Sequence, residues 1–244
     1  PMVQEDDHNL YVYHLTMGEQ KQAGIAATFS VEDYDNDIIK KHEKTRKVKE
    51  DDRTKHIIIT EAQTGAVFLT YRGIEAVNKI VDKTMNETEP IYNFTTEDGI
   101  IHKMWAMPKE GVTTVVNEVR KSDYLYIADG HHRAASASRS QKVKMENNPD
   151  HDGSEEYNYF LAVLFPAEEL KILPYNRVVF DLKGMTANDF IDKVKKYFDV
   201  DRCDHASPKE RGTICMYIEN GWYLLKPNDN VVPGESVGEK LDVS

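Results

Sequence analysis

The sequence predicts an α+β fold: a mixed sheet with flanking helices, followed by a small C-terminal βαββ unit. Two observations predict this class. Strand-like runs alternate with helical segments over most of the chain, and a strand–helix–strand–strand order is expected near its end. The length of 244 residues and the 40% hydrophobic content suffice for one large domain with a smaller appendix.

The N-terminal part is expected to begin with two strands and a helix. Residues 10–15 alternate in character and are rich in tyrosine, a polar turn at 18–21 follows, and a second strand is expected near 24–29. Ser30 is expected to cap a helix, because acidic residues follow it in the first turn. We expect this helix to run through residues 38 and 39 into the charged segment 40–53.

Strand and helix signals then alternate. Residues 56–60 and 66–71 are expected to be strands joined by a hairpin at 63–65, and a helix is expected over 74–85. A second hairpin around 97–99 leads into a strand over 100–107. Four valines between residues 112 and 119 have the spacing of one helical face.

The second half contains a sharp change from strand to helix. A short strand at 124–128 leads into residues 129–133, and small residues continue as a helix. A polar loop at 147–156 and a central strand at 159–165 are expected next. The tail is expected to form a strand at 178–182, a helix at 186–197 and strands at 213–219 and 222–225. Lys183-Gly184 is taken as the boundary, so the predicted domains are 1–183 and 184–244.

The charge balance limits the classes of partner. The formal net charge is −11, and a field of this sign repels nucleic-acid backbones and anionic membranes. We therefore expect a small-molecule substrate and a nucleotide as partners, with no nucleic acid and no membrane. An anionic ligand would need a focused cluster of positive groups. The oligomeric state stays open.

The cysteine count and the hydropathy favour a cytoplasmic location. Two cysteines in this length do not form a disulfide framework. No run approaches the ~18 apolar residues of a membrane span, and no signal peptide opens the sequence. The ends of the chain lie in awkward places, which is typical of a fragment of a longer protein.

The segment Asp129-Gly130-His131-His132-Arg133 is the main candidate for chemistry. It follows a buried strand and begins a helix, where unpaired backbone N–H groups and a partial positive charge favour an anion. Glycine allows close approach to the backbone, and the arginine fork matches phosphate oxygens. Asp129 could bind Mg²⁺, and the histidines could donate or transfer protons. The alternative is a plain helix cap with exposed histidines.

This segment resembles the signature of the ParB/sulfiredoxin superfamily, which carries a Gly-X-X-Arg phosphate-binding turn. The Asp-Gly-His-His-Arg version is similar to that of the microbial free-serine kinases. Residues 31–52 and 124–180 together resemble a large bacterial family of unknown function, domain-of-unknown-function family number 1015. The words that carry this resemblance are Ser-Val-Glu-Asp-Tyr at 30–34, Lys-His-Glu-Lys-Thr-Arg at 41–46 and Asp-Arg at 52–53.

The resemblance implies roles for residues on both sides of the turn. The His42-Glu43 pair matches the pair of the serine kinases in which glutamate is the catalytic base. The implied activity is phosphoryl transfer from ATP or ADP, with Mg²⁺ at Asp129, to a hydroxyl of a small metabolite, free serine being one candidate. The implied catalytic residues are Glu43, Asp129 and His131. The implied phosphate- and nucleotide-binding residues are Gly130, His132, Arg133, Thr45 and Arg46.

Departures from the family pattern leave other functions open. The spacing from Glu43 to Asp129 is much longer than in the compact serine kinases. The word expected before the tail reads Pro-Tyr-Asn-Arg at 174–177 and lacks its histidine, which argues against serine as the substrate. Tyr175 and Arg177 follow the predicted central strand and are candidates for substrate binding. The second hypothesis is a nucleotide-binding switch or scaffold without transfer chemistry. A sulfiredoxin-like repair enzyme is disfavoured, because histidines occupy the turn where a cysteine is needed.

Three further patterns are interpreted as structural. The charged segment 40–53 has, without the resemblance, the character of a solvated helix with i,i+4 ion pairs. The run Asp150-His151-Asp152-Gly153 resembles part of a calcium loop but lacks the required glutamate spacing. Cys203 and His205 lie close together in sequence, but no second ligand pair has zinc spacing. Both of the latter are expected to be ordinary loops.

Overall fold

The computed structural model of the chain describes residues 9–173, 176–219 and 221–231. The chain divides into two compact units, residues 1–171 and 172–244. The predicted boundary between residues 183 and 184 falls in the segment between the last element of unit 1 and the first helix of unit 2, which carries no regular secondary structure where it is described.

Unit 1 is a mixed α+β domain, as the sequence predicts. Its strands are β1 (Tyr11–Met17), β2 (Gln20–Ser30), β3 (Ile39–Lys40), β4 (Val67–Tyr71), β5 (Tyr92–Thr95), β6 (Ile101–Ala106), β7 (Leu125–Asp129) and β8 (Tyr159–Pro166). Its α-helices are α1 (Val31–Asp35), α2 (Lys47–Thr60), α3 (Glu75–Glu87), α4 (Lys109–Val119) and α5 (His131–Glu146), with short 3₁₀ turns η1 (Glu156–Asn158) and η2 (Ala167–Glu169).

The eight strands form one sheet in the order β3-β7-β4-β8-β2-β1-β6-β5. β3 pairs with β7 and β4 pairs with β8 in parallel, whereas the other neighbours are antiparallel. β8 is central and is followed along the sheet by the long strand β2. Most side chains of β8 are buried on both faces of the sheet, which explains why residues 159–165 form a nearly continuous apolar run.

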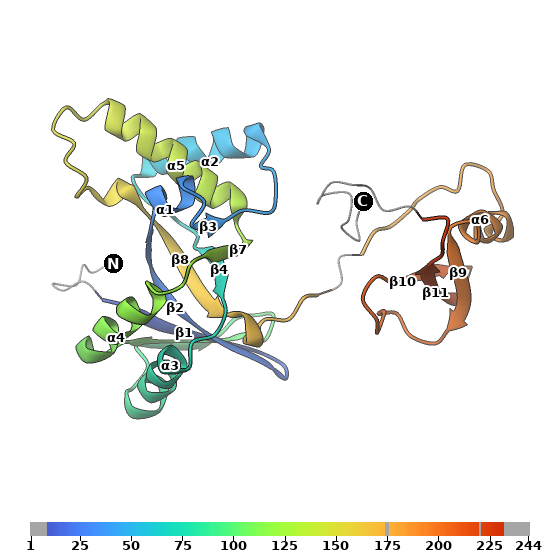
Figure 1. Cartoon of the computed structure of the whole chain (residues 1–244), viewed down its shortest axis with the longest axis horizontal. Helices are drawn as coiled ribbons and strands as arrows, with labels where there is room; N and C mark the ends of the chain where they lie inside the picture. The colour runs from blue at the N-terminus through green and yellow to red at the C-terminus, as the bar shows by residue number, and fades with distance from the viewer. Residues whose placement is uncertain (1–8, 174–175, 220, 232–244) are drawn as a thin grey trace. The chain divides into compact units, whose positions relative to one another are not determined.

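Four helices of unit 1 form two pairs, α2 with α5 and α3 with α4, and the short α1 also packs against α5 (Figure 1). The main core lies between the sheet and these helices, where Leu69, Ile127 and Phe160 are almost completely buried. Small side chains line the inner side of α5, with Ala134 and Ser136 fully buried. α5 therefore approaches the sheet closely, which fixes the position of its first turn.

The opposite face of the sheet carries a smaller cluster around Ala26, Val163 and Phe165. Phe94 stacks on His102 with ring centroids 5.0 Å apart, and the Tyr13 hydroxyl lies 2.6 Å from Nδ1 of the same histidine. These contacts join the β5–β6 hairpin to β1. Tyr13, Phe94 and His102 also line an open hollow of about 350 Å³ on this face.

Three predictions for unit 1 are wrong, and each was based on local pattern alone. The first concerns the helix capped by Ser30. The cap is confirmed, because the Asp33 amide donates to Ser30 Oγ at 3.2 Å, but α1 ends at Asp35. Asp37 then adopts a positive φ of 57°, and Ile39 is buried in β3 beside Leu125.

The second and third errors are neighbours in the sequence. Residues 56–60, predicted as a strand from their β-branched side chains, form the last turns of α2, because packing against α5 overrides local propensity. Residues 63–65 are not a hairpin but connect α2 to β4. The Gln63 side chain bonds the backbone of β8 at Tyr159 and Leu161, over 2.9 and 2.8 Å.

Unit 2 contains helix α6 (Ala187–Val194) and the strands β9 (Phe198–Cys203), β10 (Ile214–Ile218) and β11 (Gly221–Pro227). Thr186 and Asp189 form a reciprocal capping box at the start of α6. The strands form an antiparallel sheet in the order β10-β11-β9. The unit is therefore αβββ, and the predicted βαββ order is wrong.

The error arose because an apolar run was expected to be a buried strand. The predicted strand at 178–182 is not a strand, and its apolar side chains are exposed, with Phe180 at 96%. Its place in the sheet is taken by β9, whose polar residues Asp199, Asp201 and Arg202 conceal the strand pattern. Across all the ranges described, no helix combines the length and the apolar character required to cross a lipid bilayer.

The central position of β4 predicts a large effect of truncating its core side chain. Leu69 is completely buried between β7 and β8, so Leu69→Ala should lower the free energy of unfolding by about 2–5 kcal/mol. Leu161→Ala on β8, where the side chain is 37% exposed, should cost less than about 1 kcal/mol. Urea denaturation followed by circular dichroism measures both values. Equal losses would contradict this placement of the core.

Candidate functional site

The predicted strand–turn–helix at residues 124–137 is present. β7 ends at Asp129, Gly130 has a φ of 94°, and α5 begins at His131. A positive φ favours glycine, and a Cβ atom here would lie 3.4 Å from the Val67 backbone. The Asp129 side chain is exposed at the end of β7, opposite Phe68 of β4. The turn therefore presents an acid and a helix start at one edge of the sheet.

His131 connects this turn to the loop 41–46. The His42 backbone N–H donates to His131 Nε2 at 3.4 Å, and the two imidazole rings meet edge to face at 4.4 Å. Because Nε2 accepts, a neutral ring carries its proton on Nδ1. This Nδ1 atom lies 3.5 Å from Glu43 Oε2. The histidine is 3% exposed and the glutamate 60%, so a buried ring orients an accessible carboxylate.

Burial lowers the pKa of His131 from its ordinary value of 6.5, and the neighbouring His42 lowers it further. Glu43 and Asp129 act in the opposite direction but do not reverse the shift. A neutral imidazole is therefore favoured near pH 7. Both acids act on the same ring, so Glu43 and Asp129 both lie near His131, which their distance in sequence could not establish.

His132 makes a second connection to the same loop. Its Nε2 accepts from the Arg46 backbone N–H at 3.0 Å, and Arg46 is the residue that caps α2. Farther along, Ser136 Oγ donates to the Glu50 carbonyl at 3.3 Å, and Arg139 pairs with Glu50 at 3.2 Å. From His132 to Arg139 along α5, the partner residues also proceed from the start of α2 toward its C-terminus. α2 and α5 therefore run parallel, with their N-termini together.

Two helix N-termini at one place attract negative charge. α2 and α5 have 14 and 16 residues, and each leaves unpaired N–H groups and a partial positive charge at its start. The connecting segment 40–49 contains six lysines or arginines and one glutamate, a balance of +5, in a chain of net charge −11. This is the focused positive cluster that an anionic ligand requires in an acidic protein.

The family comparison agrees with one part of the resemblance. Residues 1–244 match a family described as "Protein of unknown function (DUF1015)". The chain belongs to this family. No curated protein and no solved structure matches it.

In this DUF1015 chain, the predicted phosphate-binding side chains differ in their surroundings. Arg133 is half-buried and donates from Nη1 to the Ala66 carbonyl at 2.8 Å. The Thr45 hydroxyl donates to the Glu50 carboxylate. The Arg46 side chain is exposed. Of these, Arg133 has several further N–H donors, because a guanidinium carries five.

The remaining predicted site residues lie elsewhere. Arg177 belongs to unit 2 and is exposed, whereas Tyr175 lies outside the described residues, so their substrate role stays a prediction. In the part of the chain described, Asp129 is not in a cluster of three metal-ligating side chains. Mg²⁺ commonly binds one or two carboxylates together with substrate phosphates, so the metal role of Asp129 also stays a prediction.

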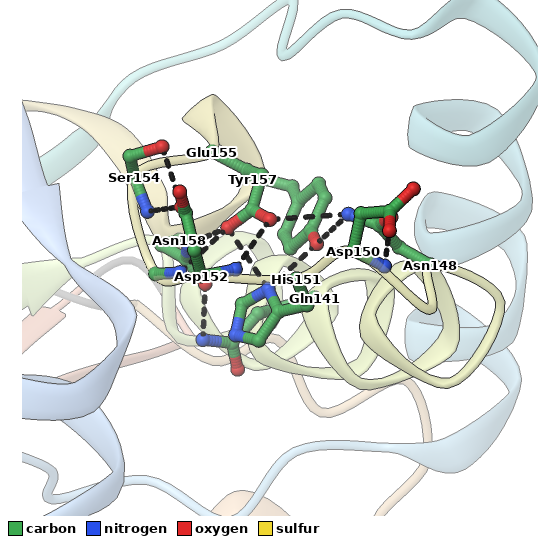
Figure 2. A network of polar contacts seen from close by, with 10 residues as sticks. Gln141, Asn148, Asp150, His151, Asp152, Ser154, Glu155, Tyr157 and Asn158 are labelled. Atoms are coloured by element: carbon green, nitrogen blue, oxygen red, sulfur yellow. Dashed lines mark hydrogen bonds and ion pairs between the residues drawn. The ribbon is translucent and has the colours of Figure 1, made fainter.

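The calcium-like segment forms a self-contained polar loop (Figure 2). The Glu155 carboxylate accepts from the amides of Asp152 and Gly153, both at 3.0 Å, and from the side chains of Asn148 and Asn158. The Asp152 carboxylate accepts from the amide and hydroxyl of Ser154. The carboxylates of Asp152 and Glu155 are thus used by the loop's own donors, and the interpretation of an ordinary loop stays a prediction.

Sequence reasoning missed two features. It placed Glu43 and Arg46 on a helix, but residues 41–46 are a loop before α2. His131 and His132 each bind its backbone, and His131 also lies beside the Glu43 side chain. It also missed a cluster in unit 2, where Cys203, His205 and Cys215 come together. The signal for this cluster in the sequence is weak, because Cys215 lies in β10, away from Cys203 and His205 along the chain.

The lowered pKa of His131 predicts a pH-dependent stability. As pH falls, the unfolded chain takes up the proton before the folded one, so stability is lost from about pH 7 downward, by at most about 1.4 kcal/mol per pH unit for one proton. His131→Asn should flatten this dependence, although His14, whose pKa burial also lowers, retains its part. Urea denaturation at several pH values measures the slope. His56→Asn, at an exposed position on α2, is the control and should leave it unchanged.

Proposed function

We propose that this DUF1015 chain transfers a phosphoryl group from ATP or ADP, with Mg²⁺, to a hydroxyl of a small metabolite, free serine being one candidate. The observation that carries the proposal is the position of Glu43. Its exposed carboxylate is oriented by the buried His131 ring, beside two converging helix N-termini.

The electrostatics support a phosphate chain at the turn. Phosphoryl transfer depends mainly on positioning and on neutralising negative charge. The starts of α2 and α5, the basic segment 40–49 and the further donors of Arg133 supply positive potential, and the exposed Asp129 carboxylate is available to Mg²⁺. The phosphates would thus lie against Gly130, His132 and Arg133.

In this arrangement Glu43 is the base. The acceptor hydroxyl gives its proton to the Glu43 carboxylate while its oxygen forms a bond to the terminal phosphorus. The bond from phosphorus to the bridging oxygen breaks, and ADP, or AMP if ADP is the donor, leaves. His131 is a positioning residue, because both of its ring nitrogens are directed at the loop.

The relation to the ParB/sulfiredoxin superfamily is part of the same proposal. It is supported by the glycine turn between β7 and α5 within a mixed sheet. Repair chemistry of the sulfiredoxin kind is not supported, because both cysteines belong to unit 2. Their free thiols favour a reducing compartment, and we infer the cytoplasm.

The kinase proposal predicts acceptor-dependent turnover that needs Glu43. With Mg²⁺, ATP or ADP, and a panel of amino acids and polyols, Glu43→Gln should lower the turnover number by about 10²–10⁴-fold and leave nucleotide affinity unchanged. Glu97→Gln, at an exposed loop position, is the matched control and should retain full activity. Phosphorylated product is measured by mass spectrometry. Full activity in Glu43→Gln would exclude this base.

The phosphate role of Arg133 predicts a loss of affinity. Arg133→Ala should weaken ATP binding by roughly tenfold to hundredfold, the equivalent of about 1.5–3 kcal/mol, measured by isothermal titration calorimetry. Arg120→Ala, at an exposed position after α4, is the control. Because Arg133 also bonds Ala66, circular dichroism must show that the variant is folded. Unchanged affinity in a folded variant would remove Arg133 from the site.

A second candidate function is a nucleotide-binding switch without transfer. The two backbone bonds from the loop 41–46 to His131 and His132 favour it, because a ligand at the turn would alter the loop directly. Hydrogen exchange of residues 41–46 that changes with nucleotide, in a chain without acceptor-dependent turnover, would select this candidate. Absence of any nucleotide binding would reject both.

A further inference from the structure

The two cysteines lie on one face of the small sheet of unit 2. Cys203 ends β9 and pairs with Trp222 of β11, and Cys215 of β10 pairs with Leu224. Trp222 and Leu224 are two residues apart on β11, so their side chains and those of their partners point to the same face. The register therefore places both thiols on one side of the sheet, flanking β11.

His205 completes the cluster from the loop that follows β9. One ring nitrogen of His205 and the two sulfur atoms all lie within 4.8 Å of one another, and all three side chains are partly buried. A tetrahedral site with metal–sulfur bonds of ~2.3 Å and metal–nitrogen bonds of ~2.0 Å separates its ligand atoms by roughly 3.5–3.8 Å. The three groups reach this separation by small side-chain rotations.

A disulfide fits this geometry less well than a metal. β9 and β10 are both neighbours of β11 and not of each other, and the partners of the two cysteines are two residues apart on β11. The sheet register therefore separates the backbones of Cys203 and Cys215 by at least two strand spacings, roughly 9 Å. Disulfide-bonded residues need Cα atoms closer than ~7 Å. An ion between the sulfur atoms spans the larger gap, because it adds two metal–sulfur bonds to the bridge.

The small core of unit 2 supports a stabilising ion. Among the described residues of this unit, the buried apolar side chains are Ala187, Ile191 and Leu225. Units of this size rarely gain enough stability from so few buried side chains, and a structural metal is one way in which small domains compensate. An ion at the three ligands would fix β9, β10 and the intervening loop to one another.

We propose that Cys203, His205 and Cys215 bind one Zn²⁺ ion, with solvent water as the fourth ligand. Two thiolates and an imidazole select a thiophilic ion of this kind over Mg²⁺ or Ca²⁺, which prefer oxygen ligands. Each thiol releases its proton to solvent as the ion binds. Asp204 Oδ1 lies 3.2 Å from His205 Nδ1. A carboxylate in this position orients a histidine that binds a metal through Nε2. None of its three ligands belongs to the proposed kinase site.

The experiment uses the whole chain, reduced and stripped of metal with a chelator, and titrates it with Co²⁺ as a spectroscopic substitute for Zn²⁺. We expect one ion per chain, with the visible bands of tetrahedral cobalt and a near-ultraviolet thiolate charge-transfer band, both removed by Zn²⁺. Cys203→Ser and Cys215→Ser should each weaken binding by more than about 100-fold, beyond the usual effect of losing a supporting group. His205→Ala should weaken it as well, whereas His56→Ala, at an exposed position of α2, should not.

A second measurement separates loss of the site from loss of the fold. Zn²⁺ should slow hydrogen exchange in residues 198–225 of the unchanged chain, and should not do so in Cys215→Ser. No Co²⁺ uptake by the reduced chain would overturn the proposal. So would uptake that both cysteine variants retain, or a Cys203–Cys215 disulfide in the chain purified under reductant.

Discussion

The parallel pairing of α2 and α5 is the constraint on which the candidate site depends. His131 and His132, in the first turn of α5, accept the backbone N–H groups of His42 and Arg46, directly before α2. These two bonds bring the starts of both helices to the end of β7. They act together with the pairing of β3 and β7 and the contacts of Ser136 and Arg139 with α2, and they let the two helix dipoles act on a common ligand.

This pairing changes the meaning of the two histidines. From the sequence they were candidates for proton transfer or phosphate binding, since exposed imidazoles serve both roles near neutral pH. In the fold, His131 is buried with a lowered pKa, and each ring accepts a backbone N–H. Their first effect is therefore to position Glu43 and the start of α2. The exposed groups at the turn are the Glu43 and Asp129 carboxylates and the Arg46 side chain.

The sequence predicts local features well where one physical signal dominates. The Ser30 cap, the glycine turn at 130 and the central strand β8 follow from capping, a positive φ and continuous burial. The errors arise where tertiary contacts override a local signal. The isoleucines at 57–59 favour a strand but belong to α2, which packs against α5. The polar strand β9 is recognisable only once β11 lies beside it. The proximity of Glu43 to the turn was available from the resemblance alone.

The cysteine–histidine cluster illustrates the same limit in another way. Zinc spacing in a sequence works when ligands lie in two compact pairs, because each pair can form on its own. Here Cys203 and His205 are close in sequence, but Cys215 reaches them only through the register of β10 and β9 on the two edges of β11. A three-stranded sheet with a small core gains more from such a connection than a large domain does. The physical case for an ion is thus strongest in the unit whose packing is weakest, independent of the chemistry at Asp129–Arg133.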